Sequence, residues 1–481
     1  MKTSKKYLYP LTIFLIALAV CLLSIKKGHQ WGDDFAQYFA QARAIYLGTT
    51  AQFVKDNTFV VLTSPIDMAT PVYPWGFTLL LSLFYPLFGE NIVLYKIITA
   101  VTVALISVLL YFFLDRYIED KELSFVISLA FGLDYFVLKF VNNVTSDMLF
   151  LLLCFLCYLP MKDYFKEEPD GKKLLLMGLV MGYSYMVRSQ GIALILSYVI
   201  CEAICFLRDR KVNYRRLLPY AGIIVVLALD KLLLPHGERS SLYFLESMDI
   251  ATFIDNIRYY FFVLEGLMPV PYSLQRPLYL AVLILAIIGI VQIVRKKESV
   301  LSFLFIVLSF LMFTGINLLF PWHQGARYML PCYPLLLLLA AYGISYVFEM
   351  IKNRKVILLA EAGMLIVLCA YGVHSYAYYN IANRRGYDKG AYTDEALELY
   401  DFVENETEED AVFCFFKPRA FYMKTGKLVY KPIAMTKEYL KDADYLIECD
   451  EDDYVRIVAV EGVDFEKVFE NDRLTVYRLI H

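Results

Sequence analysis

Apolar residues occur in long unbroken blocks along most of the chain, as at 11–23, 97–114 and 278–294. A helix needs about 20 largely apolar residues to cross the roughly 30 Å hydrocarbon core of a membrane. Such blocks predict eleven crossings, at 7–25, 91–114, 123–141, 147–160, 174–188, 191–207, 217–234, 277–294, 300–320, 328–350 and 356–374. We therefore expect an all-α protein that spans a membrane many times.

One further apolar block, at 75–88, is short and contains Pro86. Basic residues are enriched in cytoplasmic loops, so their positions test whether this block crosses the membrane. If it does not cross, and residues 1–6 are cytoplasmic, the most basic stretches all lie inside; they are 208–216, 295–297 and 352–355. We therefore expect 75–88 to be an interfacial or re-entrant segment, with the N-terminus cytoplasmic and the C-terminus outside. The first block has no small-residue cleavage site after it and is expected to stay as an anchor.

Composition supports this class. The chain has 481 residues, of which 59% are hydrophobic and 20% charged, whereas soluble proteins have about 45–50% apolar and about 25% charged residues. Residues 380–481 contain 14 Lys and Arg against 23 Asp and Glu, a net charge of −9, while the preceding residues carry +6. Two domains follow: a transmembrane domain at 1–379, and a small extracytoplasmic α/β domain at 380–481. The basic clustering of a nucleic-acid binder is missing, so no nucleic acid is expected as a partner.

Polar residues gather at the predicted outer ends of the helices, where ionisable groups next to lipid are functional candidates. They are Asp33, Asp34, Glu90, Asn142, Asp147, Arg188, His323, Arg327 and Tyr328, with Lys139 one turn from an outer end. The acidic pair opens a stretch, 35–46, whose apolar residues recur at helical spacing. We expect a short amphipathic helix in the membrane interface there, within the first outer loop at 26–90. The pair itself can be a helix cap or a base.

Five sequence motifs occur in an order that resembles a known enzyme class. They are WGDDFAQYFAQARAI after the first crossing, PVYPWGFTLLLSLFYPLFGEN before the second, NNVTSDMLFLLL, MVRSQGIAL and ARYMLPCYPLLLLLAAYG. Over roughly residues 1–350 the chain resembles the GT-C class of integral-membrane glycosyltransferases, and within it the protein O-mannosyltransferase and aminoarabinose-transferase group and its bacterial relatives (glycosyltransferase family 39-like). It differs in having Asp34 where the family often has Glu, and in lacking a basic residue just after the acidic pair.

The resemblance implies a GT-C-like fold with transmembrane and interfacial helices. It also implies an enzyme that moves a hexose or pentose from a polyprenyl-phosphate-linked donor, presented outside the cytoplasmic leaflet, to a hydroxyl group. The acceptor is expected to be a cell-envelope glycan, lipid or protein. Membrane lipids surround the enzyme, and the expected location is a bacterial plasma membrane.

The chemistry of this transfer suggests roles for the polar residues. The leaving lipid phosphate has a second pKa of about 6, so it needs cationic stabilisation and no acid. Arg188, Arg327 and Lys139 are the predicted ligands of the donor phosphate. The acceptor hydroxyl needs a base, and a like-charged neighbour in a low-dielectric site raises the pKa of an Asp toward usefulness. We predict Asp33 as that base, Asp34 as its neighbour or as an acceptor-orienting group, and inversion at the anomeric carbon.

Contacts to acceptor or sugar are predicted for Asp147, Glu90, Asn142, His323 and Tyr328. Plainer roles stay open: Asp147 can cap its helix, and the arginines can extend toward the membrane surface. A divalent cation, Mg²⁺ or Mn²⁺, held by Asp33, Asp34 or Asp147 also stays open, because carboxylates suit these ions.

Two other function classes are compatible with many crossings. A flippase or transporter for a lipid-linked sugar is expected to have inverted repeats and charges at the membrane midplane. A polysaccharide polymerase or ligase with a pyrophosphate-linked donor is expected to have more arginines in its large outer loop. The segment 380–481 is read as an acceptor-side or packing module, and a disulfide between Cys414 and Cys449 stays open.

Overall fold

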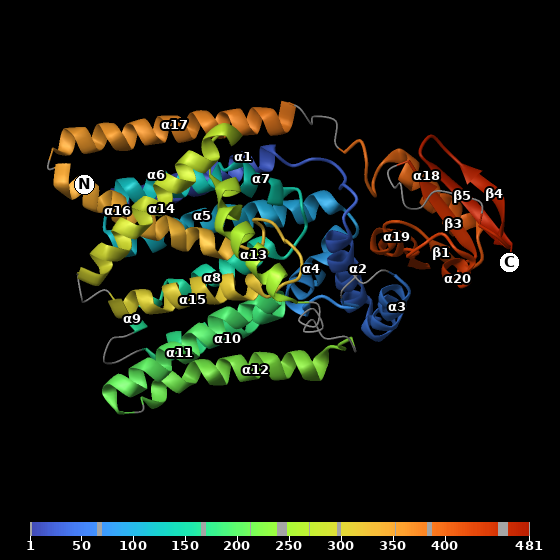
Figure 1. Cartoon of the computed structure of the whole chain (residues 1–481), viewed down its shortest axis with the longest axis horizontal. Coiled ribbons are helices and arrows are strands. Elements are labelled where there is room, and N and C mark those ends of the chain that lie inside the picture. Colours follow the sequence, from blue (N-terminus) through green and yellow to red (C-terminus); the bar gives the residue numbers. More distant parts are fainter. Residues whose placement is uncertain are drawn as a thin grey trace.

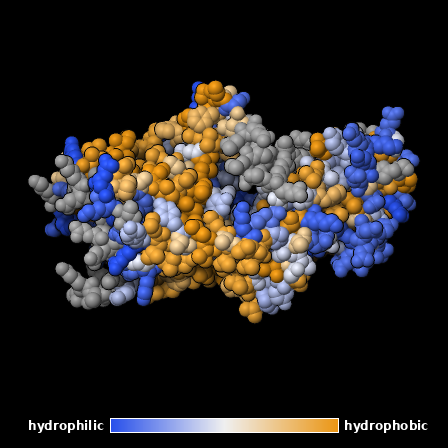
Figure 2. Space-filling view, turned by 90° about the horizontal axis from the view of Figure 1, so that it is seen from below, coloured by the Kyte–Doolittle hydropathy of each residue, from blue (hydrophilic) through white to orange (hydrophobic). Residues whose placement is uncertain are grey.

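The computed structural model describes residues 2–64, 70–164, 170–211, 213–237, 248–268, 270–295, 300–351, 353–381, 387–450 and 460–480. Long helices run side by side along the molecule, and a small sheet domain lies beyond one end of them (Figure 1). Three short helices lie at that same end: α2 (Asp33–Leu47), α3 (Thr50–Thr63) and α4 (Trp75–Phe88). The surface over the long helices is largely apolar, whereas the sheet domain is largely hydrophilic (Figure 2).

The long helices carry the membrane-spanning part. They are α1 (Lys2–Leu23), α5 (Ile92–Ile118), α10 (Gly171–Val187), α11 (Ile192–Asp209), α12 (Leu218–Leu233), α14 (Tyr272–Arg295), α15 (Val300–Leu318), α16 (Tyr333–Ile351) and α17 (Arg354–Ile381). Shorter helices between them are α6 (Lys121–Gly132), α7 (Tyr135–Val141), α8 (Asp147–Tyr158), α9 (Met161–Tyr164) and α13 (Ile250–Val263). In the part of the chain that the structure describes, five helices are long and apolar enough to cross a membrane, or six if α6 and α7 form one span. The helical membrane fold is as expected, but the number of eleven crossings is not confirmed.

The crossing expected at 123–141 is interrupted in the structure. Helices α6 and α7 are bent by 52° relative to each other. At the break, the buried carboxylate of Asp134 accepts hydrogen bonds from the backbone N–H groups of Phe136 (2.8 Å) and Val137 (3.2 Å). A side chain that satisfies the first free N–H groups of a helix marks a helix start. One apolar block therefore forms two helices, and the crossing expected at 123–141 stays a prediction.

Helix α2 confirms the predicted short helix after the acidic pair, but its surroundings differ from those of an interfacial helix. Eight consecutive residues, 35–42, are buried. Helix α4 packs on one side of α2, and a helix of the sheet domain packs on another. Even Gln37 and Gln41 are buried, and both are hydrogen-bonded. The start of α2 is thereby held rigidly between two parts of the protein.

The sheet domain confirms a small C-terminal α/β unit. Its five-stranded sheet has the order β2-β1-β3-β5-β4, formed by β1 (Val412–Cys414), β2 (Leu428–Tyr430), β3 (Tyr445–Cys449), β4 (Asp464–Glu470) and β5 (Leu474–Ile480). Strand β1 is parallel to β2 and β3, and β5 is antiparallel to β3 and β4. The helices are α18 (Asp394–Glu406), α19 (Pro418–Thr425) and α20 (Lys437–Leu440). No disulfide joins Cys414 and Cys449. The boundary at 379 and 380 stays a prediction.

Glycines allow α14 and α16 to pack at very short range. A Cβ added at Gly343 would lie 2.1 Å from the carbonyl oxygen of Leu285, and one added at Gly289 would lie 2.1 Å from that of Leu339. Small residues at such contacts are typical of membrane helices, because close backbone approach strengthens van der Waals packing where lipid gives no hydrophobic drive. Around Gly315, in α15, an added Cβ would meet nothing within 4 Å.

Replacement of Gly343 by Ala is therefore expected to destabilise the protein, by about 1–3 kcal/mol for an overpacked contact. Gly315→Ala is the matched control: it adds the same methyl group into open space and is expected to be neutral or stabilising, because Ala favours helix more than Gly does. Thermal unfolding of both variants in detergent checks this. Equal melting temperatures for the two variants would contradict the close packing of α14 and α16.

Candidate active site

The start of α2 presents the acidic pair. Gly32 is the N-cap residue in an extended conformation, and Asp33 and Asp34 form the first turn of the helix. One and two turns further on, Gln37 and Gln41 lie on the same face as Asp34. Gln37 donates to the carbonyl of Pro71 (2.8 Å), and Gln41 exchanges hydrogen bonds with the backbone of Tyr73 (2.9 and 3.1 Å). Helix α2 therefore holds the segment that places Tyr73 over its acidic start.

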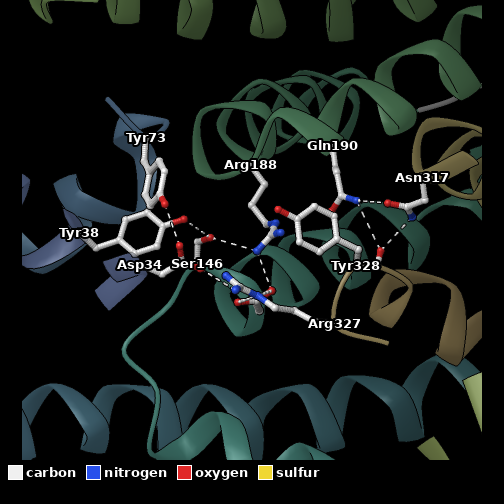
Figure 3. A network of polar contacts seen from close by, with 10 residues as sticks. Asp34, Tyr38, Tyr73, Ser146, Arg188, Gln190, Asn317, Arg327 and Tyr328 are labelled. Atoms are coloured by element: carbon white, nitrogen blue, oxygen red, sulfur yellow. Dashed lines mark hydrogen bonds and ion pairs between the residues drawn. The ribbon is translucent and has the colours of Figure 1, made fainter. Parts of the chain in front are cut away.

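Tyr73 and Arg327 hold the carboxylate of Asp34 from two sides. The hydroxyl of Tyr73 donates to Asp34 Oδ1 at 2.7 Å, and Arg327 Nη1 donates to Asp34 Oδ2 at 2.6 Å (Figure 3). Arg327 comes from the turn before α16, which is 293 residues away along the chain. Both carboxylate oxygens of Asp34 are thus engaged.

Asp147 joins the same network from the start of α8. Arg327 Nε lies 2.8 and 2.9 Å from its two carboxylate oxygens, and Arg188 Nη1 lies 2.6 Å from Oδ1. The Asp147 side chain is only 1% exposed and that of Arg188 only 9%. Buried charges of this kind are stable only when they are paired and hydrogen-bonded. Neither arginine extends away to the membrane surface, and Asp147 does more than begin a helix.

Side chains around the two arginines fix their orientation. The guanidinium of Arg188 lies 4.8 Å from the ring centre of Tyr328, a cation–π distance. The backbone carbonyl of Tyr328 accepts from Asn317 (3.2 Å) and from Gln190 (3.5 Å), and these two amides bond each other at 3.0 Å. Figure 3 shows Arg188 and Arg327 converging in front of Asp34 and Ser146. The predicted residues Asp34, Asp147, Arg188, Arg327 and Tyr328 are thus brought together.

Asp33 lies beside this network with a different environment. Its Oδ1 atom is buried without a hydrogen-bond partner, and its Oδ2 atom lies 3.9 Å from Lys417 Nζ. Burial raises the pKa of Asp33. Burial would also raise the pKa of Asp34, but the charge of Arg327 and the hydrogen bonds from Tyr73 and Arg327 outweigh it and lower that pKa to about 2. The two adjacent carboxyl groups therefore differ: Asp33 retains free basic capacity, and Asp34 is a clamped anion.

Three predicted site residues lie outside the network. Lys139 is exposed and sits 4.6 Å from the ring centre of Tyr135. Glu90 pairs with Arg43 (3.2 Å) and with Lys424 of α19 (3.4 Å). His323 stacks on the ring of Tyr259 in α13 at 3.8 Å, and its Nε2 lies 3.0 Å from Asp255 Oδ2. Their roles in binding stay predictions.

Asn142 holds the polypeptide before α2. Its side chain accepts from the backbone N–H of Lys26 (2.8 Å) and donates to the carbonyl of Ser24 (2.7 Å). The fully buried Lys96 donates to the carbonyls of Lys26 and Gly28 (3.0 and 2.6 Å) in the same place. Asn142 therefore fixes the path of the chain from α1 to the acidic pair, and its predicted contact with sugar stays a prediction.

Contributors to the site that were missed in the sequence include Tyr73 and, from the sheet domain, Lys417 and Arg419. Tyr73 lies in the motif before the second crossing, but nothing in that motif singles out its hydroxyl group. Arg419 comes from α19 of the sheet domain: it donates to the Tyr73 hydroxyl (2.5 Å) and to the carbonyl of Thr70 (2.9 Å). No spacing rule connects a residue of the soluble tail with the first outer loop, so only the structure reveals it.

Comparisons with known proteins find similar sequences and folds. Residues 69–233 match the model of the dolichyl-phosphate-mannose-protein mannosyltransferase family. The fold is similar to that of ArnT from Cupriavidus metallidurans, solved bound to undecaprenyl phosphate, with a TM-score of 0.60 and 13% identity over 97% of each chain. The resemblance to the GT-C class of membrane glycosyltransferases is confirmed. The comparison of this chain with curated proteins found no match.

A second GT-C structure is also similar. It is the Archaeoglobus fulgidus oligosaccharyltransferase tethered to an acceptor peptide, with a TM-score of 0.56 and 10% identity over 93% of this chain and 70% of that one. These likenesses show the fold: a largely helical GT-C-like membrane protein with a small C-terminal sheet domain. The donor, the acceptor and the residue roles are matters for proposal.

A GT-C fold raises the question of a metal. Another structure of the A. fulgidus oligosaccharyltransferase is a complex with zinc and sulfate, with a TM-score of 0.50 and 11% identity over 91% of this chain and 68% of that one. In the present chain the guanidinium of Arg327 lies between Asp34 and Asp147 and bonds both. A cation that bridged these carboxylates would have to displace it. Among the described residues, no cluster of three His, Cys, Asp or Glu side chains could hold a metal ion. The predicted ligand set does not fit a shared metal.

Chelation is therefore expected to leave activity unchanged. Protein treated with EDTA and freed of metal is expected to turn over any donor that it uses at the rate of untreated protein, because Arg327 already supplies the positive charge between the carboxylates. Loss of turnover after chelation, with recovery on addition of Mn²⁺ or Mg²⁺, would contradict this arrangement.

Proposed function

We propose that the protein is an inverting glycosyltransferase that moves a sugar from a polyprenyl-phosphate donor to a hydroxyl acceptor on the outer face of the membrane. One observation carries the proposal: a carboxyl group with free basic capacity, Asp33, adjoins an anion clamped by Arg327, whose guanidinium also bonds Asp147. Transfer from a lipid phosphate to a hydroxyl needs a base next to cationic groups, and these residues supply both.

Asp33 is the base in this proposal. Its buried Oδ1 atom has no hydrogen-bond partner, so it can accept the proton of an acceptor hydroxyl. Burial raises its pKa, which brings an Asp closer to the range in which proton transfer is efficient. Asp34 cannot do this well, because its pKa is lowered to about 2. Asp34 instead orients Arg327 and Tyr73.

The arginines stabilise the leaving phosphate. Arg188 and Arg327 lie at the carboxylates of Asp147 and Asp34. Guanidinium groups match phosphate oxygens with a forked geometry. The departing polyprenyl phosphate is a weak base and needs no proton from an acid. This favours Arg188 and Arg327 as the ligands of the phosphate.

A single displacement then gives inversion. Asp33 removes the proton of the acceptor hydroxyl while the oxygen attacks the anomeric carbon, and the bond to the lipid phosphate breaks on the opposite side. The network has no second carboxylate free to act as a nucleophile, since both Asp34 and Asp147 are held by arginines. A double displacement with retention is therefore disfavoured.

The location and partners follow from the same proposal. The basic stretches at 208–216 and 295–297 favour a cytoplasmic side for the inner loops, which leaves α2 and the sheet domain outside. There they meet donors presented on the outer leaflet of a bacterial plasma membrane. The ArnT structure contains undecaprenyl phosphate, which supports a polyprenyl-phosphate donor. The acceptor is a glycan, lipid or protein of the cell envelope, and the sugar is a hexose or pentose.

Asp33→Asn is expected to lower the rate of polyprenyl phosphate release by about 10²–10⁴, the usual contribution of a general base. The assay uses purified protein in detergent, a panel of polyprenyl-phosphate sugars, and NMR of the product to read its anomeric configuration. Asp401→Asn, on the exposed side of α18, is the control and is expected to keep the wild-type rate.

Three outcomes would overturn the proposal in different ways. A fully active Asp33→Asn variant would show that Asp33 is not the base. Movement of the sugar-lipid without cleavage of its bond would indicate a flippase. Turnover only with pyrophosphate-linked oligosaccharides would indicate a polymerase or ligase.

A further inference from the structure

The sheet domain docks on the start of α2 through its basic side chains, although residues 380–481 carry a net charge of −9. Helix α19 packs along α2. Trp31, just before α2, meets the rings of Phe415 and Phe416 edge-on at 5.6 and 5.5 Å. An acidic domain that turns its cations toward an acidic pair is oriented by charge as well as by packing.

Arg419 links this domain to Asp34. It is only 5% exposed, and it donates to the Tyr73 hydroxyl, which in turn donates to Asp34. Its guanidinium also lies 4.8 Å from the ring centre of Tyr73. Its Nε atom is buried without a hydrogen-bond partner, and in the described part of the chain no carboxylate lies within salt-bridge distance of it. A buried arginine without a carboxylate partner is costly for stability, so packing alone is a poor account of it.

Lys417 links the same domain to Asp33. It is the N-cap residue of α19, two positions before Arg419. Its Nζ atom lies 3.9 Å from Asp33 Oδ2, and its side chain is 32% exposed. Each member of the acidic pair thus faces one cation of the sheet domain, Asp33 directly and Asp34 through Tyr73.

We propose that the sheet domain completes the catalytic centre: Lys417 and Arg419 are positioning residues that keep Asp33 ionised and Asp34 in place. The proposal rests on the proposed function, in which Asp33 is the base. This role of the C-terminal domain goes beyond packing, because the membrane domain supplies the acidic pair with only one directly bonded cation, Arg327.

The charges around Asp33 give the direction of the effect. Burial raises the pKa of Asp33, the charges of Lys417, Arg419 and Lys431 lower it, and Asp34 raises it. Loss of Lys417 removes the largest of the opposing charges, so the pKa of Asp33 rises further. A base with a raised pKa is protonated, and therefore inactive, up to a higher pH. In a variant without Lys417, the acidic limb of the plot of kcat/KM against pH is therefore expected to move to higher pH, and the plateau at high pH to stay.

The test is the pH dependence of kcat/KM for polyprenyl phosphate release by the full-length protein. Lys417→Met is expected to move the acidic limb upward by about one pH unit, the lower end of the range for loss of a nearby opposite charge. Its rate at the high-pH plateau is expected to stay close to that of the wild type. Lys417→Arg restores the charge and is expected to restore the limb. Lys424→Met is the matched control, because Lys424 is on the same helix and in the same interface but pairs with Glu90.

The role of Arg419 is tested by a double-mutant cycle in kcat. Since Arg419 acts through Tyr73, the double variant Arg419→Met with Tyr73→Phe is expected to lose less than the sum of the free-energy losses of the two single variants. Melting temperatures identify variants that fail to fold.

The results separate this inference from the proposed function. An unmoved limb in Lys417→Met, a uniform loss of activity at every pH, or an equal shift in Lys424→Met would overturn the inference, even where Asp33→Asn is inactive. A fully active Asp33→Asn variant would instead overturn the proposed function, and this inference with it.

Discussion

One guanidinium group joins three helices at the end of the bundle that carries the sheet domain. Arg327 bonds Asp34 at the start of α2 and Asp147 at the start of α8, which lie 293 and 180 residues before it in the sequence. Each of these charges would be costly to bury alone, and each is tolerated because the others are present. Arg188 shares Asp147 and so joins the end of α10 to the same point. The position of every other polar group of the site depends on this junction.

The junction also gives two neighbouring carboxyl groups, those of Asp33 and Asp34, different surroundings. Asp34 has a structural role, because Arg327 and Tyr73 donate hydrogen bonds to its two carboxylate oxygens. Asp33 keeps one buried oxygen unbonded and has a raised pKa. Adjacent residues of one type thus acquire different chemistry from their surroundings: Asp34 is the counter-ion of Arg327, and Asp33 is the base of the proposed mechanism. The sheet domain contributes to both environments through Lys417 and Arg419.

The apolar blocks predicted the helical membrane fold because hydrophobic length is a local property of the sequence. The sequence could predict that four charged residues meet: Asp34, Asp147, Arg188 and Arg327. Charged side chains at helix ends on one side of a membrane avoid lipid by facing the protein interior and pairing with one another. The break at Asp134 depends on a cap within one apolar block, which leaves the hydropathy of that block unchanged. Helix α13 has 14 residues and carries Asp255 and Arg258 in its middle, so it is too short and too polar to be predicted as a crossing. Docking of the sheet domain on α2 depends on tertiary contacts between distant segments, which no local pattern encodes.

The central claim is that Arg327 and Asp147 stabilise the protein as a pair. A double-mutant cycle measures this directly, from the unfolding of wild type, Asp147→Asn, Arg327→Met and the double variant in detergent. The account predicts that the double variant loses less stability than the sum of the two single losses, with a coupling of about 1–3 kcal/mol. Losses that add to within about 0.3 kcal/mol, as for independent sites, would contradict it.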